Sequence, residues 1–465
     1  MSFPRYPEYK DSGQDWLGTI PSHWTVMPLA KIALGPGSLF IDGDWVESKD
    51  LADDGIRYIT TGNVGEGRYK EQGSGYISQA KFDELRCTEV LPGDVLISRL
   101  NLPIGRACVV PDLGERIITS VDNVITRPDS GYSRAYLAYM LSSASHFANM
   151  EILARGTTMQ RISRSTLGQV RFAFPTEEQT TIATFLDRET AKIDALVAEQ
   201  EKLIGLLQEK RQAVISHAVT KGLDPNVPMK DSGVEWLGEV PGHWEPKRLK
   251  FLASNIKAGP FGSALTKDMY VGSGYRVYGQ EQVIPGDFAI GDYYIDEAKF
   301  AELSQYETRT DDVLISCVGT FGKIAVVPAD AAPGIINPRL IRLRTAKDVM
   351  PLFLAEVLRS TVTFEQFSVL SRGGTMDVIN IGTLSDIWIA LPPIAEQSAI
   401  LNEITTQMAR FDALMAQAQS AITLLQERRT ALISAAVTGQ IDVRGLAGGA
   451  NAPDSIAASD YPASA

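Results

Sequence analysis

One short stretch of the chain gathers arginines without acidic neighbours. The segment ARGTTMQRISRSTLGQVRF (154–172) contains no Asp or Glu. A guanidinium group can bind a phosphate or pair bidentately with the edge of a guanine base, and a glycine lets the backbone approach a phosphate closely. The pattern predicts a nucleic-acid contact, although a solvated loop is the alternative. Its candidate residues are Arg155, Gly156, Thr158, Arg161 and Arg164.

A second segment, LSRGGTMDVINIGTLSDIWI (370–389), resembles the first but has a different charge. It keeps an Arg-Gly pair, loses the other arginines and gains Asp377. The two segments therefore share a predicted backbone turn but not a basic character. The candidates in this second turn are Arg372, Gly373 and Thr375.

Further cations could contribute to the same chemistry. The stretch IKAGPFGSALTKDMY (256–270) combines lysines, an aromatic residue and a glycine, and an ordinary turn is the alternative interpretation. Its candidates are Lys257, Phe261, Gly262, Ser263 and Lys267. Arg99 in LISRLN is a weaker candidate, because Cys317 stands at the matching place later in the chain.

Catalytic signatures are missing from the sequence. GTFGK (319–323) is too short for a phosphate-binding GxxxxGK[ST] loop, and there is neither an HExxH motif nor a GxGxxG after a strand. Leu391-Pro392-Pro393-Ile394 lacks the polar residue that would seat an amino group for methyl transfer. The sequence therefore favours recognition over catalysis. A fused methyltransferase or nuclease remains an alternative, as does a scaffold that bridges two protein partners.

Length and composition predict a reduced, cytoplasmic protein of several domains. The 465 residues exceed a single core, no apolar run is long enough for a membrane span, and the three cysteines stand far apart. The net charge of −12 disfavours nucleic acid, but residues 25–175 carry 16 Lys and Arg against 17 Asp and Glu, and residues 245–393 carry 15 against 17. Nearly neutral domains can still present a basic face.

The chain repeats itself. KDSGQDWLGTIPSHW (10–24) returns as KDSGVEWLGEVPGHW (230–244) with ten of fifteen positions identical, and residues 195–220 match residues 413–438 at 15 of 26 positions. Between these two matching segments, PGDVLIS aligns with TDDVLIS and LARGTTM aligns with LSRGGTM at nearly the same offset. A fixed-offset repeat predicts two copies of one structural module. The repeated His-Trp pairs, at His23 and His243, are interpreted as packing residues.

Two long helices are predicted over 177–220 and 395–438. They hold a single glycine and no proline, Thr176 with Gln179 forms a capping-box pattern at the first start, and apolar residues recur every seven positions. Two separate amphipathic helices are the alternative. The predicted coiled-coil seam contains Leu186, Ile193, Leu207 and Val214 in the first helix and Ile404, Phe411, Leu425 and Leu432 in the second. Within each seven-residue step, a second apolar position is expected three residues on. We call this position the half-step, and it is occupied by Leu196, Leu203 and Leu414.

Connection lengths favour antiparallel helices. A parallel pair would need a return path of about 66 Å at 1.5 Å per residue, whereas only a short connector follows the first helix. We therefore expect a mixed α/β protein in which two globular domains are separated by an antiparallel coiled coil, with internal pseudo-twofold symmetry. The expected segments are an opening segment (1–24), domain 1 (25–175), a central region (176–244), domain 2 (245–393), a distal region (394–445) and a disordered tail (446–465).

The ordered set of motifs resembles the specificity subunits of type I restriction–modification enzymes. The resemblance rests on KDSG..WLG..P.HW before each domain, the RGxTM loops, P-x-x-EQ at each helix start and the LLQE[KR]R…A[VL]IS…AVT helices, and it covers residues 10–445. Each motif alone is modest, but their order and duplication are specific.

The resemblance implies a function, partners and cofactors. In that family each variable domain is a target recognition domain that reads one half of a split double-stranded DNA sequence. The helices set the half-site separation and bind two methyltransferase subunits, through which restriction subunits join. The resemblance further implies a non-catalytic chain without a cofactor of its own, since S-adenosylmethionine, ATP and Mg²⁺ bind to the partner subunits.

Overall fold

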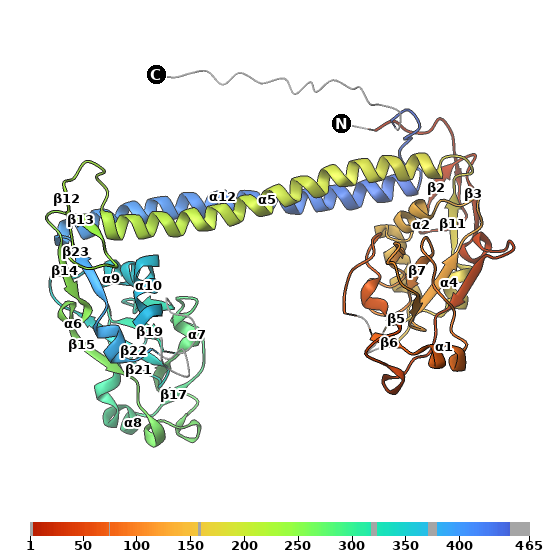
Figure 1. Ribbon diagram of the computed structural model, residues 1–465. Coiled ribbons are helices and arrows are strands. Elements are labelled where there is room, and N and C mark those ends of the chain that lie inside the picture. Colours follow the sequence, from red (N-terminus) through yellow and green to blue (C-terminus); the bar gives the residue numbers. More distant parts are fainter. Residues whose placement is uncertain (1–2, 74, 157–159, 318–322, 371–378, 447–465) are drawn as a thin grey trace, which may run out of the picture. The chain divides into compact units, whose positions relative to one another are not determined.

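The computed structural model describes residues 3–73, 75–156, 160–317, 323–370 and 379–446. The chain divides into two compact units, and the division falls inside both long helices (Figure 1). Unit 1 comprises Met1–Gln200 and Ser420–Ala465, and unit 2 comprises Glu201–Gln419. Each unit therefore holds one α/β body, the first part of one long helix and the last part of the other.

Two small sheets form the body of unit 1. The first is antiparallel with strand order β4-β10-β7-β8, and the second has the order β6-β5-β9, with β5 and β9 parallel. The strands of unit 1 are β1 (Tyr9–Asp11), β2 (Thr19–Pro21), β3 (Thr25–Pro28), β4 (Leu39–Asp42), β5 (Ile56–Ile59), β6 (Gly75–Ile77), β7 (Val95–Ser98), β8 (Ala107–Val109), β9 (Ile117–Thr119), β10 (Asn123–Arg127) and β11 (Arg171–Phe174). Its helices are α1 (Gln79–Leu85), α2 (Arg134–Met140), α3 (Ala144–Leu153), α4 (Arg164–Gln169) and the start of α5 (Gln179–Lys221).

Unit 2 repeats this topology. Its first sheet has the order β15-β22-β19-β20, and its second, β17-β16-β21-β18, again contains one parallel pair, β16 and β21. The strands are β12 (Met229–Asp231), β13 (Glu239–Pro241), β14 (Glu245–Arg248), β15 (Ala253–Ala258), β16 (Tyr275–Tyr278), β17 (Tyr294–Ile295), β18 (Glu307–Thr308), β19 (Val313–Ser316), β20 (Ile324–Val326), β21 (Gly334–Ile336), β22 (Leu340–Thr345) and β23 (Trp388–Leu391). The helices are α6 (Leu249–Leu252), α7 (Gln280–Val283), α8 (Glu297–Glu302), α9 (Pro351–Arg359), α10 (Thr361–Leu370), α11 (Ile381–Ser385) and α12 (Ile394–Val437).

Successive side chains of the repeated DVLIS strand point to opposite faces of the sheet, and each face packs against its own hydrophobic core. In unit 1, Val95 and Ile97 point into the large core with α2 and α5, whereas Leu96 points to the second sheet. In unit 2, Val313 and Ile315 join the large core and Leu314 the smaller one. Successive residues of a strand face opposite sides, so a continuous apolar run marks a strand that is buried on both faces.

The repeated opening segment packs against the end of a long helix. Trp24 and Trp244 are both fully buried. A Cβ built on Gly222, just past α5, would lie 3.4 Å from the Trp244 ring, and one on Gly439, just past α12, would lie 3.3 Å from Trp24. The expectation that the His-Trp pair serves packing therefore holds for the tryptophans.

The histidines of the pair make polar contacts instead. His23 Nε2 lies 2.6 Å from Glu178 Oε1, and His243 Nε2 lies 2.7 Å from Glu396 Oε2. Each pair joins an opening segment to the start of a long helix. The repeated opening segment thus has a structural role, because it connects to the start of a long helix in each unit.

The glutamine of each P-x-x-EQ motif does not complete a capping box. Gln179 Oε1 accepts a hydrogen bond from the backbone N–H of Ser133 at 3.0 Å, and its Nε2 donates to the carbonyl of Pro175 at 3.0 Å. Gln397 makes the equivalent bonds with Met350 and Pro392. The expected capping box at Gln179 is wrong, because this buried side chain ties the long helix to the start of α2.

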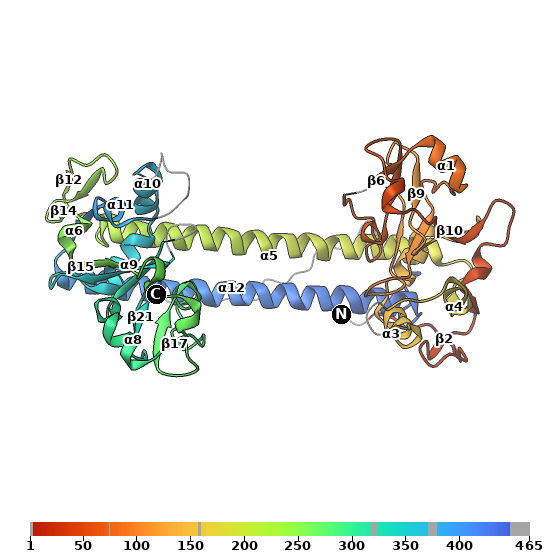
Figure 2. The ribbon, with the colours of Figure 1, turned by 90° about the horizontal axis from the view of Figure 1, so that it is seen from below.

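The long helices pair antiparallel within each unit. In unit 1, the beginning of α5 lies beside the end of α12 in both ribbon views (Figure 1 and Figure 2), and Arg429 Nε donates to Asp194 Oδ1 at 2.8 Å. In unit 2, Arg211 Nη1 donates to Asp412 Oδ1 at 2.6 Å. Ile182, Leu186 and Ile193 share a core with Leu432 and Ala436.

The seven-residue step of the predicted seam is right, but its half-step is wrong. The residues expected at the half-steps, Leu196, Leu203 and Leu414, are 46%, 43% and 47% exposed. Several residues four positions after a seam residue pack against the core instead, among them Val197 and Met408. Steps of four and then three residues keep the apolar side chains on one side of a helix. Leu196, Leu203 and Leu414, three positions after a seam position, lie at the edge of this apolar side and are exposed.

Two consecutive helices stand near the end of each body, α2 and α3 in unit 1 and α9 and α10 in unit 2. A buried serine ends the first and caps the second, with Ser143 accepting from His146 N–H before α3 and Ser360 accepting from Thr363 N–H in α10. No helix among the described residues is long and apolar enough to cross a membrane. Of the expected disordered tail (446–465), only Leu446 is among the described residues, and it packs against the core of unit 1.

Candidate nucleic-acid interface

The arginine segment of unit 1 is a loop closed at its base by two backbone hydrogen bonds. Arg155 and Arg161 exchange N–H···O bonds of 3.0 Å in both directions. Two further bonds join the loop to the chain after β7, from Ile162 N–H to the Arg99 carbonyl and from Asn101 N–H to the Gln160 carbonyl. Thr158 lies outside the described residues.

The three loop arginines differ in how they are held. Arg155 is exposed and has no ion pair within the described parts of the chain. Arg161 donates to Asp122 Oδ1 at 2.8 Å, and Arg164 lies 3.3 Å from Asp42 Oδ2 and donates to the Phe40 carbonyl. The carboxylates orient two guanidinium groups while both side chains stay about half exposed.

Arg99 is a buried structural residue rather than a surface contact. It is 6% exposed, lies 3.1 Å from Asp42 Oδ1 and donates to the carbonyls of Ile162 and Val121. Burial lowers the pKa of Arg99 from its usual value, and the nearby carboxylate of Asp42 opposes that effect. Its role is therefore to fix the base of the arginine loop.

A hollow of about 710 Å³ opens beside this loop. Arg155 and Arg161 form one part of its wall, and Ile152, which is 80% exposed, forms another. A concave surface with guanidinium groups and an apolar side chain suits the polar and methyl-bearing edges of nucleobases.

Unit 2 reproduces two backbone hydrogen bonds at the base of this loop, with different residues. Ile379 N–H donates to the Cys317 carbonyl at 3.0 Å, and Cys317 N–H donates to the Arg339 carbonyl at 2.8 Å. In unit 1, Ile162, Arg99 and Asp122 occupy the corresponding places. The loop candidates Arg372, Gly373 and Thr375 lie outside the described residues.

Sequence analysis missed Arg339, the cation of unit 2 at this place. Arg339 is exposed and stands at the repeat position of Asp122, so an acid in one unit corresponds to a base in the other. A residue-by-residue alignment of TSVDNV with INPRLI would have found the exchange. Cys317 is buried, and burial raises its pKa to about 11, which leaves a neutral thiol where unit 1 has Arg99.

The remaining candidates of unit 2 lie together along β15 and the two short 3₁₀ turns that follow, η4 (Gly262–Ala264) and η5 (Lys267–Met269). Phe261 is 71% exposed, and Gly262 and Ser263 are exposed next to it. Lys257 Nζ lies 5.4 Å from the centre of the Tyr306 ring, and Lys267 is exposed. Gly262 has φ +63°, a conformation that favours glycine.

An ion pair between a buried aspartate and a partly exposed arginine supports each first sheet. Asp94 accepts from Arg127 Nε at 2.8 Å, and Asp312 accepts from Arg344 Nε at 2.8 Å. Both aspartates are the first residue of the repeated DVLIS segment and stand directly before strands β7 and β19. The pair therefore belongs to the frame that both units share.

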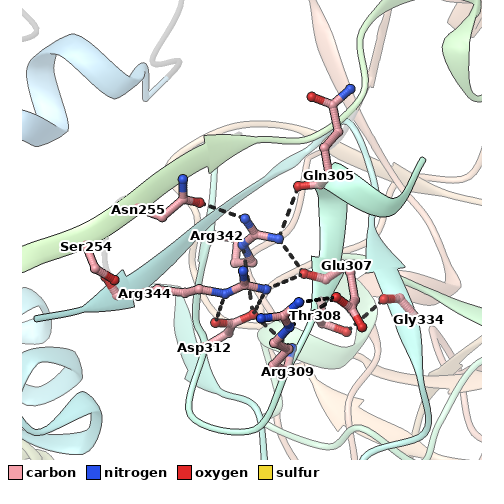
Figure 3. Close-up of polar contacts among 10 residues, drawn as sticks. All are labelled: Ser254, Asn255, Gln305, Glu307, Thr308, Arg309, Asp312, Gly334, Arg342 and Arg344. Carbon is pink, nitrogen blue, oxygen red and sulfur yellow. Dashed lines mark hydrogen bonds and ion pairs between the residues drawn. The ribbon is translucent and has the colours of Figure 1, made fainter. Parts of the chain in front are cut away.

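Unit 2 adds a second guanidinium, which is buried, to this frame. Arg342 points between the strands toward Asn255 and the chain around Glu307, and only 3% of its side chain is exposed (Figure 3). It donates to Asn255 Oδ1 at 2.7 Å and to the carbonyls of Gln305 and Glu307. Ile125 stands at the same place in unit 1.

The described residues contain no group of three or more His, Cys, Asp or Glu side chains that could hold a metal ion. The three cysteines are buried and unbridged.

Comparisons with known proteins agree on one family. Residues 244–424 match the type I restriction modification DNA specificity domain. A Methanocaldococcus jannaschii protein, assigned as the MjaX specificity subunit of a type I restriction enzyme, is 22% identical over 92% of this chain and 96% of its own length. The StySPI specificity subunit of Salmonella potsdam is 21% identical over 91% of this chain and 90% of its own length.

Solved structures show the same fold. A chain from a study of assembly and conformational transition in a type I restriction–modification system has a TM-score of 0.60 at 16% identity, covering 90% of this chain and 98% of its own. The HsdS subunit of Thermoanaerobacter tengcongensis has a TM-score of 0.52 at 17% identity, with the same two coverages. Residues 244–424 therefore form a type I restriction modification DNA specificity domain, and the chain as a whole is similar to specificity subunits of type I restriction enzymes.

Proposed function

We propose that this chain reads a two-part DNA target, one half-site per unit, and scaffolds a restriction–modification complex. The subunit itself is non-catalytic. Two methyltransferase subunits and the restriction subunits join it, and they carry S-adenosylmethionine, ATP and Mg²⁺.

One observation carries this proposal: the two units share a backbone frame but exchange charges on it. The same hydrogen bonds hold Arg99 and Cys317, and the same chain position holds Asp122 and Arg339. A frame with exchangeable side chains suits two readers of different sequences. A purely structural duplication gives no reason for an acid in one copy and a base in the other.

Each reader has its own donor set. In unit 1, Arg155 and Arg161 would bind phosphates or guanine edges, and the exposed Ile152 would meet a thymine methyl group. In unit 2, Arg339, Lys257 and Lys267 would supply the positive charge. Because the donors differ, the half-sites would differ and the target would not be a palindrome.

The long helices are proposed to set the distance between the half-sites. DNA readers that contact two half-sites tolerate any bases between them when the spacing suits their geometry. Inserting one heptad into both α5 and α12 should change the length of the tolerated spacer. An unaltered spacer would remove this role from the helices.

The central experiment exchanges residues 25–175 for the matching domain of another family member. Methylated bases are then mapped in cells that carry the hybrid chain and its methyltransferase. One half-site should change while the other and the spacer stay the same. A change in both half-sites, or DNA affinity that does not fall with salt, would contradict the proposal and favour a protein-bridging scaffold.

A further inference from the structure

An exposed aromatic residue stands at the same place in both units. Trp45 follows β4 and is 68% exposed, and Phe261 follows β15 and is 71% exposed. Two residues before each, Gly43 and Gly259 donate an N–H···O bond of 2.9 Å to the first residue of β10 and of β22, respectively. The sheet register therefore makes the two aromatic residues equivalent. Sequence analysis named Phe261 but not Trp45.

The glycine before each aromatic residue packs on the turn that carries the exchanged charges. A Cβ on Gly43 would overlap the carbonyl oxygen of Ser120, and a Cβ on Gly259 would overlap that of Asn337. Both carbonyls belong to the turn that ends two residues later with the acid of unit 1 or the base of unit 2. Because only glycine permits this close approach, the aromatic residue has a fixed place beside each reading surface.

Further contacts hold the Trp45 segment. Asp44 makes two backbone hydrogen bonds of 2.8 and 2.9 Å with the neighbouring turn, one through its N–H and one through its carbonyl. The Glu47 carboxylate accepts a hydrogen bond from the Trp45 side chain and pairs with Lys49 Nζ at 2.6 Å. The indole is thus held at its polar edge, while most of the side chain remains exposed.

The segment of unit 2 is restricted by other means. Pro260 stands at the repeat position of Asp44, and its ring fixes the backbone dihedral φ directly before Phe261. The turn beside it is closed by Arg339, whose N–H donates to Asn337 Oδ1 at 2.8 Å. A ring on a restricted backbone loses less conformational entropy when it binds.

The recurrence distinguishes these two residues from ordinary surface residues. Single exposed apolar side chains are common and need no function. Here the charge on the adjacent turn is reversed between the units, yet the exposed residue is aromatic in both. Every base has a flat face on which an aromatic ring can stack. The same contact can therefore serve two readers of different sequences.

We propose that Trp45 and Phe261 are wedges that each open one base step at their half-site and stack on the exposed base. The faces of paired bases are hidden in a duplex, and apolar side chains reach them by insertion between base steps. The inference rests on the proposed function, because it assigns one DNA contact to each unit. It adds a contact that positions the DNA without reading its sequence. Because a methyltransferase acts on a base that has left the stack, an opened step also favours the reaction of the assembled complex.

The test uses the full chain assembled with the methyltransferase subunits of its own system, and a duplex with the target found by methylation mapping. The duplex carries 2-aminopurine, whose fluorescence rises when the base unstacks, at each position of the half-sites in turn. Trp45→Ala should remove the rise at one position of one half-site. Phe261→Ala should remove it at one position of the other half-site.

Binding measured by fluorescence anisotropy gives a second readout. Trp45→Ala and Phe261→Ala should each weaken binding about tenfold, within the range for a stacked base. The salt dependence should stay unchanged, because no phosphate contact is lost. The methylated sequence should also stay the same, because a ring that stacks on any base does not select one.

Matched variants keep the result specific. Trp45→Phe and Phe261→Trp should keep the affinity within threefold, because either ring can stack. Phe251→Ala removes a side chain that is 66% exposed before the other end of β15, and it should change affinity less than twofold. A loss for Phe251→Ala as large as that for Phe261→Ala would overturn the assignment. Melting curves should stay unchanged in all variants, because the three side chains are exposed.

The remaining outcomes separate the wedges from the proposed function. Alanine variants with full affinity and an unchanged fluorescence rise would overturn the wedges and leave the proposed function intact. Weaker binding with the rise retained would identify a groove contact and overturn insertion. An altered methylated sequence would make the rings sequence readers and overturn their neutral role. A wild-type complex that prefers no DNA sequence would overturn the proposed function as well.

Discussion

The two units share the buried aspartate that supports each first sheet, whereas equivalent backbone at the surface carries opposite charges. Asp94 with Arg127 and Asp312 with Arg344 are interchangeable parts of one frame. A few residues away, Asp122 and Arg339 carry opposite charges on equivalent backbone. Buried charges need their partner, whereas an exposed charge can be exchanged at little cost in stability. The frame can thus stay constant while the recognition surface changes.

The largest expected effect comes from removing the buried carboxylate of unit 2. Asp312→Asn should destabilise unit 2 by about 3–5 kcal/mol, because Arg344 and the deeply buried Arg342 lose their counter-charge. Asp94→Asn should cost unit 1 less, because Ile125 replaces the second guanidinium there. Hydrogen exchange of β19 and β7 measures each unit separately. Equal losses would show that Arg342 does not depend on Asp312.

Acid should affect unit 1 before unit 2. Burial lowers the pKa of His146 to about 4, and its ring is held by the Gly105 carbonyl at 3.1 Å. The unfolded state then binds the extra proton between pH 6.5 and 4, so unit 1 loses stability as the pH falls through this window, by on the order of 3 kcal/mol.

The sharpest variant is His146→Thr, because unit 2 carries Thr363 at the same place. It should remove the acid sensitivity of unit 1 in hydrogen exchange followed from pH 7 to pH 4.5. Acid sensitivity that persists in this variant would assign the effect to other groups.

The corrected seam predicts unlike results for two neighbouring leucines of α5. Leu207 is 9% exposed, and Leu207→Ala should cost about 2 kcal/mol, the low end for a buried leucine. Leu203→Ala should cost less than about 1 kcal/mol, because this side chain is 43% exposed. Chemical denaturation measures both losses, and a loss for Leu203→Ala as large as that for Leu207→Ala would restore Leu203 to the seam.

The smallest effects should distinguish the two reading surfaces. Arg161→Ala and Arg339→Ala should each weaken DNA binding by about 1 kcal/mol and lower its salt dependence by about one phosphate contact. Each change should relax one half-site only, as read from methylation patterns. Loss of selectivity at both half-sites by either variant would break the comparison between the units.

Much of the backbone frame could be predicted from the sequence, because the same motifs occur in both repeats. The DVLIS strands, the seven-residue step and the P-x-x-EQ joints all appear at a constant offset. The half-step of the seam could not be predicted, because Leu196 and Leu203 are more apolar than the residues that point inward. The hydrophobicity pattern of a helix predicts which side is apolar. It does not predict which residues of that side contact the partner helix.

The site was harder to predict than the frame. Arg99 looks like a surface cation in sequence, yet it is buried because Asp42 and two carbonyls from distant segments surround it. Arg339 was missed because its neighbours Arg342 and Arg344 give the whole strand a basic appearance. Arg339 lies in the turn before β22, whereas Arg342 and Arg344 lie within the strand. Which of the three faces outward depends on the direction of each side chain along β22 and in that turn.

The division of the chain has a consequence for its synthesis on the ribosome. Unit 2 is one continuous stretch, whereas unit 1 needs Ser420 onward to complete its helix pair. The part translated first is therefore finished last. Until the end of α12 emerges, Trp24, Ile182 and Leu186 lack their cover, and a nascent chain in that state exposes the surfaces that chaperones bind.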